Sequence, residues 1–332
     1  MSQIKAVVIA HSKSAVNGKE IITFELEFPR LILAEFNTHN ALSKNASSSR
    51  AIPVAKMLEQ VRNNPAMPVR FGKKNKGMQD AGEHGGYVEL WNEYMEDYES
   101  YCAEDAWRQA AESAAEYAEQ FDKAGYAKQI CNRLVEPFQM MKVVMTATEL
   151  NNFIWLRDHP AADPTIEALA KAINKAKKSS TPVILEPGDW HTPYFEKGFW
   201  KKDWVHAYSG DGWTKQYTLE DALAISASCC AQVSFRSLDD SIEKAYSVVE
   251  KLNLGGKDGE PVHASPLEHQ ATPIQETQYE DLSRKPAVNE MGDTDTWEKG
   301  ITHMDRDETF CSGNLKDWIQ HRQLIPNNVK RG

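Results

Sequence analysis

Three strand-length runs restrict the fold more than any other feature of this sequence. Residues 5–12 (KAVVIAHS) form a short apolar run, residues 20–28 (EIITFELEF) partly alternate, and residues 140–148 (MMKVVMTAT) are rich in β-forming side chains. Runs of this length and pattern predict β-strands. Because segments with helical signals separate them, the 332 residues can form a single large α+β unit.

Boundary signals place the helices around these strands. A proline in a favoured first-turn position starts residues 53–65, and Asp163 with Pro164 marks the start of a helix over residues 165–178. Further helices are expected over the ranges 31–42, 126–135, 149–157, 218–235 and 238–252, the last ended by Gly255 and Gly256. Residues 255–312 are polar, acidic and dotted with glycine, which indicates a long excursion from the core.

A helix is also predicted where aromatic residues recur after residue 86. Trp91, Tyr94, Tyr98 and Tyr101 follow one another at spacings of three and four, and the other face is acidic. That spacing is typical of one helical face. We therefore expect the four rings to pack in the core, in preference to forming an exposed stacking surface.

Charge and composition limit the classes of function. With 41% hydrophobic and 26% charged residues, the chain has the composition of a globular protein. The net charge of −10 argues against a general nucleic-acid binder, which needs a concentrated basic face. Five cysteines without C-x-x-C spacing favour reduced thiols over a disulfide framework or a zinc site. Without a signal peptide or a membrane-length apolar span, the protein is expected to be cytoplasmic.

The densest group of hydrogen-bonding side chains lies in residues 35–53 (EFNTHNALSKNASSSRAIP), between two predicted helices. Ser47, Ser48 and Ser49 can cap the helix that follows, which is a common role for serine. Together with Arg50 they can also bind a phosphate, because free backbone N–H groups, the helix dipole and a guanidinium meet there. The sequence leaves both roles open.

Other polar residues show no motif for a metal or a nucleotide. The ten histidines lack a spacing such as H-E-x-x-H, so no metal site is predicted, and no G-x-S-x-G, Walker loop or G-x-G-x-x-G occurs. Arg133 and Arg157 lie near the ends of largely apolar predicted helices. A cation in that setting needs either a carboxylate partner or an anionic ligand.

Three ordered segments resemble one known family. Residues 38–53 (THNALSKNASSSRAIP), 131–137 (CNRLVEP) and 150–160 (LNNFIWLRDHP) are similar to segments of the flavin-dependent thymidylate synthases, the ThyX family, in particular a longer branch that includes phage members. The resemblance implies a ThyX-like α+β fold, with helices packed around a β-sheet, mainly helical by residue count, in a single catalytic domain over residues 1–332. It also implies a homotetramer with active sites at subunit interfaces.

The matching positions imply roles for individual residues. His39, Ser43, Asn45, Ser48 and Arg50 fall on the family signature. By resemblance, the nucleotide is bound by Ser48, Ser49, Arg50, Arg133 and Arg157, of which Arg157, facing the pyrimidine, and Ser48 act in catalysis. By the same resemblance, the flavin is bound by His39, Ser43, Asn45, Asn152 and His269.

The resemblance also implies a reaction. NADPH reduces FAD, methylenetetrahydrofolate supplies one carbon, and C5 of dUMP is methylated without a cysteine nucleophile. Arginines hold the phosphate and stabilise negative charge on the ring. A runner-up with the same cofactors methylates or hydroxymethylates dCMP or another pyrimidine nucleotide, because one contact at position 4 of the base can switch the preference. A third candidate is a non-catalytic flavin- or nucleotide-binding homologue.

The order of segments differs from that of shorter family members. Segments like 226–235 (SASCCAQVSF) and 265–269 (SPLEH) precede the signature there but follow it here, which suggests a circular permutation. Residues 318–322 (WIQHR) then resemble the run into the family's R-H-R triplet, in which Thr38 and Asn40 replace both arginines here. We expect Gln320, His321 and Arg322 to complete the cofactor site; an ordinary exposed C-terminal helix is the alternative.

Several positions depart from the family pattern. The family has arginine where this chain has Asn40, and short members have glutamate, asparagine and arginine where it has Ala46, Thr146 and Thr148. The long branch has arginine at the position of Cys229. Loss of a guanidinium is not conservative at an anion site. These departures are compatible with an altered cofactor site, an altered nucleotide or loss of activity. If a phage encodes the chain, the expected compartment is the host cytoplasm.

Overall fold

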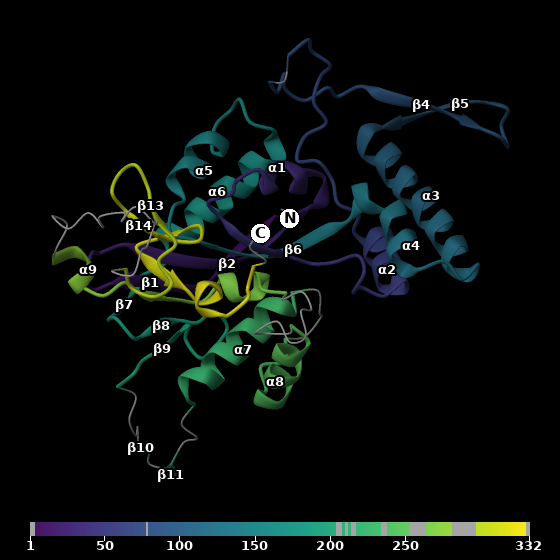
Figure 1. The fold of residues 1–332 in the computed structure, drawn as a ribbon. Helices are drawn as coiled ribbons and strands as arrows, with labels where there is room; N and C mark the ends of the chain where they lie inside the picture. The colour runs from purple at the N-terminus through teal and green to yellow at the C-terminus, as the bar shows by residue number, and fades with distance from the viewer. Residues whose placement is uncertain are drawn as a thin grey trace.

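A computed structural model gives the structure of the chain (Figure 1). It describes residues 4–77, 79–203, 217–233, 238–252, 263–280 and 297–329, and the backbone of the short strands β10 (Tyr208–Ser209) and β11 (Gly212–Trp213). The predicted helix stop at Gly255 and Gly256 lies outside the described residues.

A five-stranded sheet forms the centre of the molecule, in the order β3-β6-β2-β1-β7. Neighbouring strands are antiparallel, except that β7 runs parallel to β1. The three strands predicted from the sequence are its inner members, and their bounds are β1 (Lys5–Ser14), β2 (Glu20–Pro29) and β6 (Met140–Ala147). The two edges are β3 (Ser43–Ala46) and β7 (Val183–Leu185).

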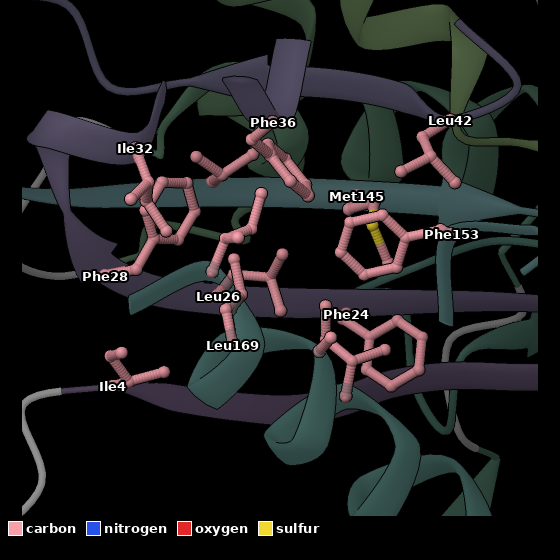
Figure 2. Packing of buried hydrophobic residues seen from close by; sticks show 14 of the residues in the cluster. Ile4, Phe24, Leu26, Phe28, Ile32, Phe36, Leu42, Met145, Phe153 and Leu169 are labelled. Atoms are coloured by element: carbon pink, nitrogen blue, oxygen red, sulfur yellow. The ribbon is translucent and has the colours of Figure 1, made fainter. Parts of the chain in front are cut away.

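One face of this sheet carries the largest apolar cluster (Figure 2). Alternate residues of β2, Phe24, Leu26 and Phe28, point to it because side chains on a strand alternate between faces. Phe36 lies edge-on to Phe28 and Phe153, with ring centroids 5.3 Å and 5.8 Å apart. This face is covered by α1 (Leu33–Asn37), α5 (Asn151–Arg157) and α6 (Pro164–Lys178).

Helix α6 begins where the sequence predicts, at an Asp163 cap. The Asp163 carboxylate accepts hydrogen bonds from the backbone N–H groups of Thr165, at 2.8 Å, and Ile166, at 3.3 Å. Asp163→Ala is expected to lower the free energy of unfolding by about 1 kcal/mol, because those donors lose their acceptor. Urea unfolding of Asp163→Ala beside Asp163→Ser measures this, and equal losses in both variants would contradict it.

The opposite face of the sheet carries a second layer. Helix α7 (Leu219–Ala231) packs there with the 3₁₀ turn η4 (Ser265–Glu268), and α8 (Ile242–Lys251) packs on α7. A small sheet of order β16-β12-β8-β9 lies beside them. Its strands are β8 (Trp190–His191), β9 (Phe199–Trp200), β12 (Ala271–Pro273) and β16 (Trp318–Gln320).

Three helices form a separate apolar cluster on one side of the sheet (Figure 1). They are α2 (Val54–Asn63), α3 (Ala103–Lys123) and α4 (Lys128–Leu134). Two antiparallel strands, β4 (Tyr87–Asn92) and β5 (Asp97–Cys102), precede α3. The helix predicted for the aromatic residues is therefore wrong: Trp91, Tyr94 and Tyr98 lie on an exposed hairpin and not in the core.

Short elements complete the described chain. They are η1 (Arg30–Ile32), η2 (Glu136–Phe138), α9 (Thr277–Glu280), β13 (His303–Met304), β14 (Phe310–Ser312), β15 (Leu315–Lys316) and η5 (His321–Leu324). Leu267, Ala271, Ile274 and Phe310 are buried, so the described parts of residues 255–312 contribute to the core, contrary to the predicted excursion. The fold is mixed α/β, with helices on both faces of the central sheet. In the described part of the chain, no helix is long and apolar enough to cross a membrane.

Candidate functional site

The polar stretch of residues 35–53 passes along the edge of the central sheet. Helix α1 ends at Asn37, earlier than predicted, and the chain turns before entering β3. The stretch is therefore not a simple connector between helices. Because side chains alternate along β3, Ser43 and Asn45 face the second layer while Lys44 faces the other side. Asn45 Nδ2 donates a hydrogen bond to the carbonyl oxygen of Cys230, at 2.6 Å.

Ser43 contacts the C-terminal part of the chain. Its hydroxyl lies 3.0 Å from Asn314 Nδ2 and 3.4 Å from Gln320 Nε2. Gln320 Nε2 also donates to the carbonyl oxygen of Glu268, at 3.2 Å. Gln320 of β16 thus contacts Ser43 of β3, although the two residues are 277 positions apart in the sequence. The C-terminal run is a buried strand followed by a 3₁₀ turn, and the alternative of an exposed C-terminal helix is wrong.

Lys44 and Arg322 add positive charge on this edge. Arg322 Nη1 forms an ion pair with Glu268 Oε1, and Arg322 Nε is buried without a hydrogen-bond partner among the described residues. Lys44 Nζ donates to the carbonyl oxygen of His39, at 2.7 Å. Burial lowers the pKa of Lys44, and the Glu268 carboxylate partly opposes that shift.

His321 does not join this group. Its ring lies edge-on to Trp190, with centroids 5.7 Å apart, beside a cavity of about 460 Å³ between α7, α8 and η5. Burial lowers the pKa of His321 to about 4. The sequence therefore predicted Gln320, His321 and Arg322 as one set, while the structure brings only Gln320 and Arg322 to Ser43 and its neighbours.

Arg157, at the end of α5, meets a carboxylate and a histidine. Arg157 Nη1 pairs with Glu35 Oε1, and Arg157 Nε donates to His39 Nε2 at 3.0 Å. His39 must then carry its proton on Nδ1. Burial, followed by the charges of Arg157 and Lys44, lowers the pKa of His39, so its ring is neutral at pH 7. Asn152, on the same helix, is exposed.

The serines before α2 do not cap it. Helix α2 follows Pro53, whose side chain makes no cap, and Ser48 Oγ instead accepts a hydrogen bond from Arg50 N, at 3.2 Å. Ser47 Oγ accepts one from Lys142 N, at 3.3 Å, which ties the stretch to β6. The capping role left open by the sequence is therefore wrong, because the serines lie too far before the helix start.

The turn over residues 48–51 is fastened to α4. Asn132 is buried, and its Nδ2 donates to the carbonyl oxygens of Ser49, at 2.8 Å, and Ile52, at 2.9 Å. Arg133 follows Asn132 on the same helix. The contact thus joins the turn that carries Arg50 to the helix that carries Arg133.

Arg50 and Arg133 differ from the other arginines. Both are exposed, and neither pairs with a carboxylate of the described residues. Every other described arginine has such a partner; these are Arg30, Arg62, Arg70, Arg108, Arg157, Arg306 and Arg322. Two uncompensated guanidinium groups, one on the turn before α2 and one next to the Asn132 that holds this turn, are suited to bind an anion, because a guanidinium can donate two parallel hydrogen bonds to a phosphate.

A buried chain of hydroxyls and imidazoles crosses the second face of the sheet. Ser12 Oγ lies 2.9 Å from His191 Nδ1, and His191 Nε2 lies 2.8 Å from Thr23 Oγ1. The chain continues over 2.6 Å to Thr146 Oγ1 and over 2.9 Å to His269 Nδ1. His269 Nε2 is buried without a partner among the described residues.

One departure from the family pattern, Thr146, belongs to this buried chain, where its hydroxyl links Thr23 to His269. Thr148 Oγ1 accepts from Lys316 N, at 2.9 Å. Cys229 is buried, and burial raises the pKa of its thiol to about 12, so it is no nucleophile at neutral pH. Among the described residues, the exposed Asn40 and the half-buried Ala46 have no partner that explains their replacement.

Acid is expected to destabilise the protein through the buried histidines. Burial lowers the pKa values of His191 and His269 to about 3, and for His191 the charges of His11 and His269 add to the effect. The unfolded chain takes up protons near pH 6.5, whereas the folded chain does not. Stability is therefore fully present above that pH and falls as the pH drops toward 3, by about 1.4 kcal/mol per pH unit for each histidine.

Urea unfolding between pH 7.5 and 5 measures this slope. His269→Asn is expected to reduce the slope by about one proton, because the amide keeps the hydrogen bond to Thr146 but does not titrate. The control is His303→Asn, a change at an exposed side chain. An equal slope in the wild type and in His269→Asn would contradict the assignment.

Some members of these groups were not predicted from the sequence. They are Glu35, Lys44, Glu268, Asn314, Thr23 and His191, which each contact a predicted residue or extend the buried chain. Of these residues, Thr23 could have been noticed in the sequence, because it places a hydroxyl within the predicted strand EIITFELEF. Among the described residues, no group of three or more His, Cys, Asp or Glu side chains could hold a metal ion.

Comparison with known proteins gives only weak similarities. No protein-family model matches the chain, and no curated protein does so significantly. Among solved structures, thymidylate synthase X (ThyX) from Helicobacter pylori, with FAD and dUMP, is 16% identical, with a TM-score of 0.32 over 47% of this chain and 67% of that one. The UMP/dUMP methylase PolB from Streptomyces cacaoi, bound with 5-Br dUMP, is 15% identical, with a TM-score of 0.38 over 55% of this chain and 92% of that one. Similarity at this level does not assign a reaction to the chain.

Proposed function

We propose that the protein is a flavin-dependent methyltransferase that methylates C5 of dUMP, and that its described elements belong to one catalytic domain. The observation that carries this proposal is the pair of arginines, Arg50 and Arg133, that have no carboxylate partner among the described residues. They belong to segments that resemble the nucleotide-binding motifs of the flavin-dependent thymidylate synthases. Arg50 lies on the turn before α2, and Arg133 follows Asn132, which holds that turn.

In this proposal the nucleotide phosphate lies between Arg50 and Arg133, with Ser48 and Ser49 of the intervening turn close to it. Arg157 donates to the pyrimidine and stabilises negative charge that develops on the ring. Its contacts with Glu35 and His39 use two of the five N–H donors of the guanidinium, so donors remain for a ligand. The neutral His39 fixes the direction of Arg157 without adding a second charge.

The cofactors of the proposal are FAD, NADPH and methylenetetrahydrofolate. FAD carries two phosphates and a polar ring system, and Lys44 and Arg322 supply cationic groups on the edge of β3 where Ser43, Asn45 and Gln320 also lie. Arg322 Nε and His269 Nε2 are buried and lack partners in the described part of the chain, which fits a polar group bound there. When bound, the flavin supplies the reducing electrons that convert the transferred carbon into a methyl group.

Two alternative functions are considered beside dUMP methylation. A dCMP methylase or hydroxymethylase would use the same phosphate and flavin contacts. A non-catalytic homologue is favoured by Asn40, Thr148 and Cys229, which stand at positions where the family pattern has arginine. The homotetramer, a phage origin and the circular permutation remain parts of this proposal.

Flavin binding tests the proposal against the non-catalytic alternative. The purified protein is loaded with FAD, its flavin absorbance is recorded, and NADPH is added without oxygen; bleaching of the absorbance is expected. Arg322→Ala is expected to raise the Kd for FAD by about tenfold or more, because a charge-assisted contact is lost. The matched control is Arg306→Ala, at an exposed arginine. Protein that cannot be loaded with FAD would eliminate both enzymatic candidates.

A further inference from the structure

In the described part of the chain, few residues pack on the hairpin of β4 and β5. Among the described residues, β4 and β5 form hydrogen bonds only with each other as a two-stranded sheet. Their main contacts with other elements are with α3. Figure 1 shows the hairpin extending past α3, away from the central sheet. An isolated two-stranded hairpin is marginally stable in water, and one of this length normally gains stability from a covering surface.

The hairpin exposes large side chains that are usually buried. The exposed fractions are 74% for Tyr87, 55% for Trp91, 101% for Tyr94 and 63% for Tyr98. Met95, at the tip, is 69% exposed. By the register of the two strands, Tyr87, Trp91 and Tyr98 lie on one face of the hairpin. Exposed tyrosine and tryptophan side chains are characteristic of protein–protein interfaces, where both residue types are enriched.

The tip of the hairpin is nevertheless well defined. Asn92 Oδ1 accepts hydrogen bonds from the backbone N–H groups of Tyr94, at 2.9 Å, and Met95, at 3.3 Å. The rings of Trp91 and Tyr98 meet edge to face across the strands, with centroids 5.4 Å apart. The aromatic surface is therefore presented in a fixed arrangement before any partner binds.

The charge of the hairpin limits which kinds of molecule can bind to it. Residues 87–107 contain seven Asp or Glu residues and no Lys or Arg. A nucleic acid or an anionic membrane would be repelled by this surface. The partner must combine apolar groups with positive charge.

On the same chain, the loop before the hairpin carries lysines, whose ammonium groups supply positive charge and whose aliphatic stems can pack on apolar groups. Lys73, Lys74 and Lys76 are exposed, and none of them pairs with a carboxylate of the described residues. Lys73 N donates to the carbonyl oxygen of Gly82, at 2.9 Å, and His84 N donates to that of Phe71, at 2.9 Å, so the loop is held as a closed turn. Its lysines are thus displayed on an ordered surface.

We propose that the β4–β5 hairpin is an association arm that docks on the lysine loop, residues 71–77, of a second copy of this chain. Arm and loop lie on the same chain, so a two-fold axis would form the contact twice between one pair of subunits, which is compatible with the proposed homotetramer. Edge-to-edge pairing of two hairpins is disfavoured, because it would bring their acidic residues together. This inference does not depend on the catalytic proposal.

A charge-swap experiment tests the arm. One variant carries Glu89→Lys, Glu93→Lys and Glu96→Lys, at exposed positions without side-chain hydrogen bonds among the described residues. The other carries Lys73→Glu, Lys74→Glu and Lys76→Glu. By sedimentation velocity, each variant alone is expected to self-associate at least about tenfold more weakly than the wild type, since arm and loop then repel each other. An equimolar mixture of the two is expected to recover the wild-type association, because each arm again meets a loop of opposite charge.

Two further variants test whether association depends on the aromatic surface of the hairpin and whether charge reversal elsewhere on the protein also affects it. Tyr94→Ser removes the fully exposed ring without changing charge and is expected to weaken association. Glu243→Lys with Glu250→Lys on α8 reverses charge elsewhere and is expected to leave association unchanged. Urea unfolding shows whether each variant is folded. A monomeric wild type, undiminished association of both charge variants, or a mixture that fails to associate would each overturn the proposal.

Discussion

Replacing Arg157 with alanine is expected to reduce the rate constant for methyl transfer by about 100- to 1,000-fold, the usual effect of losing one donor to a developing charge. Binding of FAD should change little, because the flavin is proposed to lie with Ser43 and Arg322. Arg157→Lys should also be impaired, since an ammonium group cannot donate in two directions to a planar ring. Single-turnover kinetics measure the step separately from binding.

The matched control is Glu35→Gln. The amide keeps an acceptor for Arg157 but removes the ion pair, in which the two side chains are 22% and 33% exposed. Partly exposed pairs contribute little, so a change in stability below about 1 kcal/mol and a nearly normal rate are expected. If both variants lost the same factor in rate, Arg157 would have a structural role and no contact with the base.

Replacing Arg50 or Arg133 with alanine is expected to raise the Kd for dUMP by about 10- to 100-fold each, because a hydrogen bond to a charged group contributes about 1.5–3 kcal/mol. The free energy of unfolding should stay nearly constant, since both side chains are exposed and pair with no carboxylate of the described residues. Titration calorimetry with dUMP measures the effect.

Deoxyuridine provides the internal control, since it has the same base and sugar but no phosphate. Both variants should bind it as the wild type does. Arg62→Ala is the control for charge, because Glu112 and Glu119 already hold that guanidinium at 2.9 Å and 2.8 Å. Loss of deoxyuridine affinity equal to the loss of dUMP affinity would contradict a phosphate role for Arg50 and Arg133.

Local signals were enough to predict the inner part of the fold. Strand β6 and helix α6 could be predicted because each carries a complete local pattern: a β-rich run, or an aspartate cap followed by proline and apolar residues at helical spacing. The positions of Arg133 and Arg157 near helix ends were also predictable, since the flanking residues show where the helices stop.

The hairpin shows where spacing misleads. Trp91 and Tyr98 are seven residues apart, which is two helical turns, but here they face each other across two strands. The turn between them has no Asn-Gly or Asp-Gly pair, and Glu96 takes the left-handed conformation, at φ 50°, that glycine would normally mark. The rings are exposed because no described element covers them, and no local sequence pattern reveals that.

The partners of the candidate site residues could not be predicted, because they depend on tertiary packing. Glu35 lies beside Arg157 only because α1 and α5 cover the same face of the sheet. Asn314 and Gln320 reach Ser43 through the second layer. The family resemblance predicted Gln320, His321 and Arg322 as residues of the cofactor site. Gln320 and Arg322 do lie near Ser43, but the ring of His321 lies against Trp190 instead.

The mass of the nucleotide product tests the central claim most directly. Protein loaded with FAD is incubated without oxygen with NADPH, methylenetetrahydrofolate and either dUMP or dCMP, and the nucleotide is then analysed by mass spectrometry. We predict that dUMP gains one methylene unit and that dCMP is unchanged. Product from dCMP alone would assign the runner-up activity, and recovery of both nucleotides unchanged from protein whose flavin NADPH reduces would contradict the proposed function.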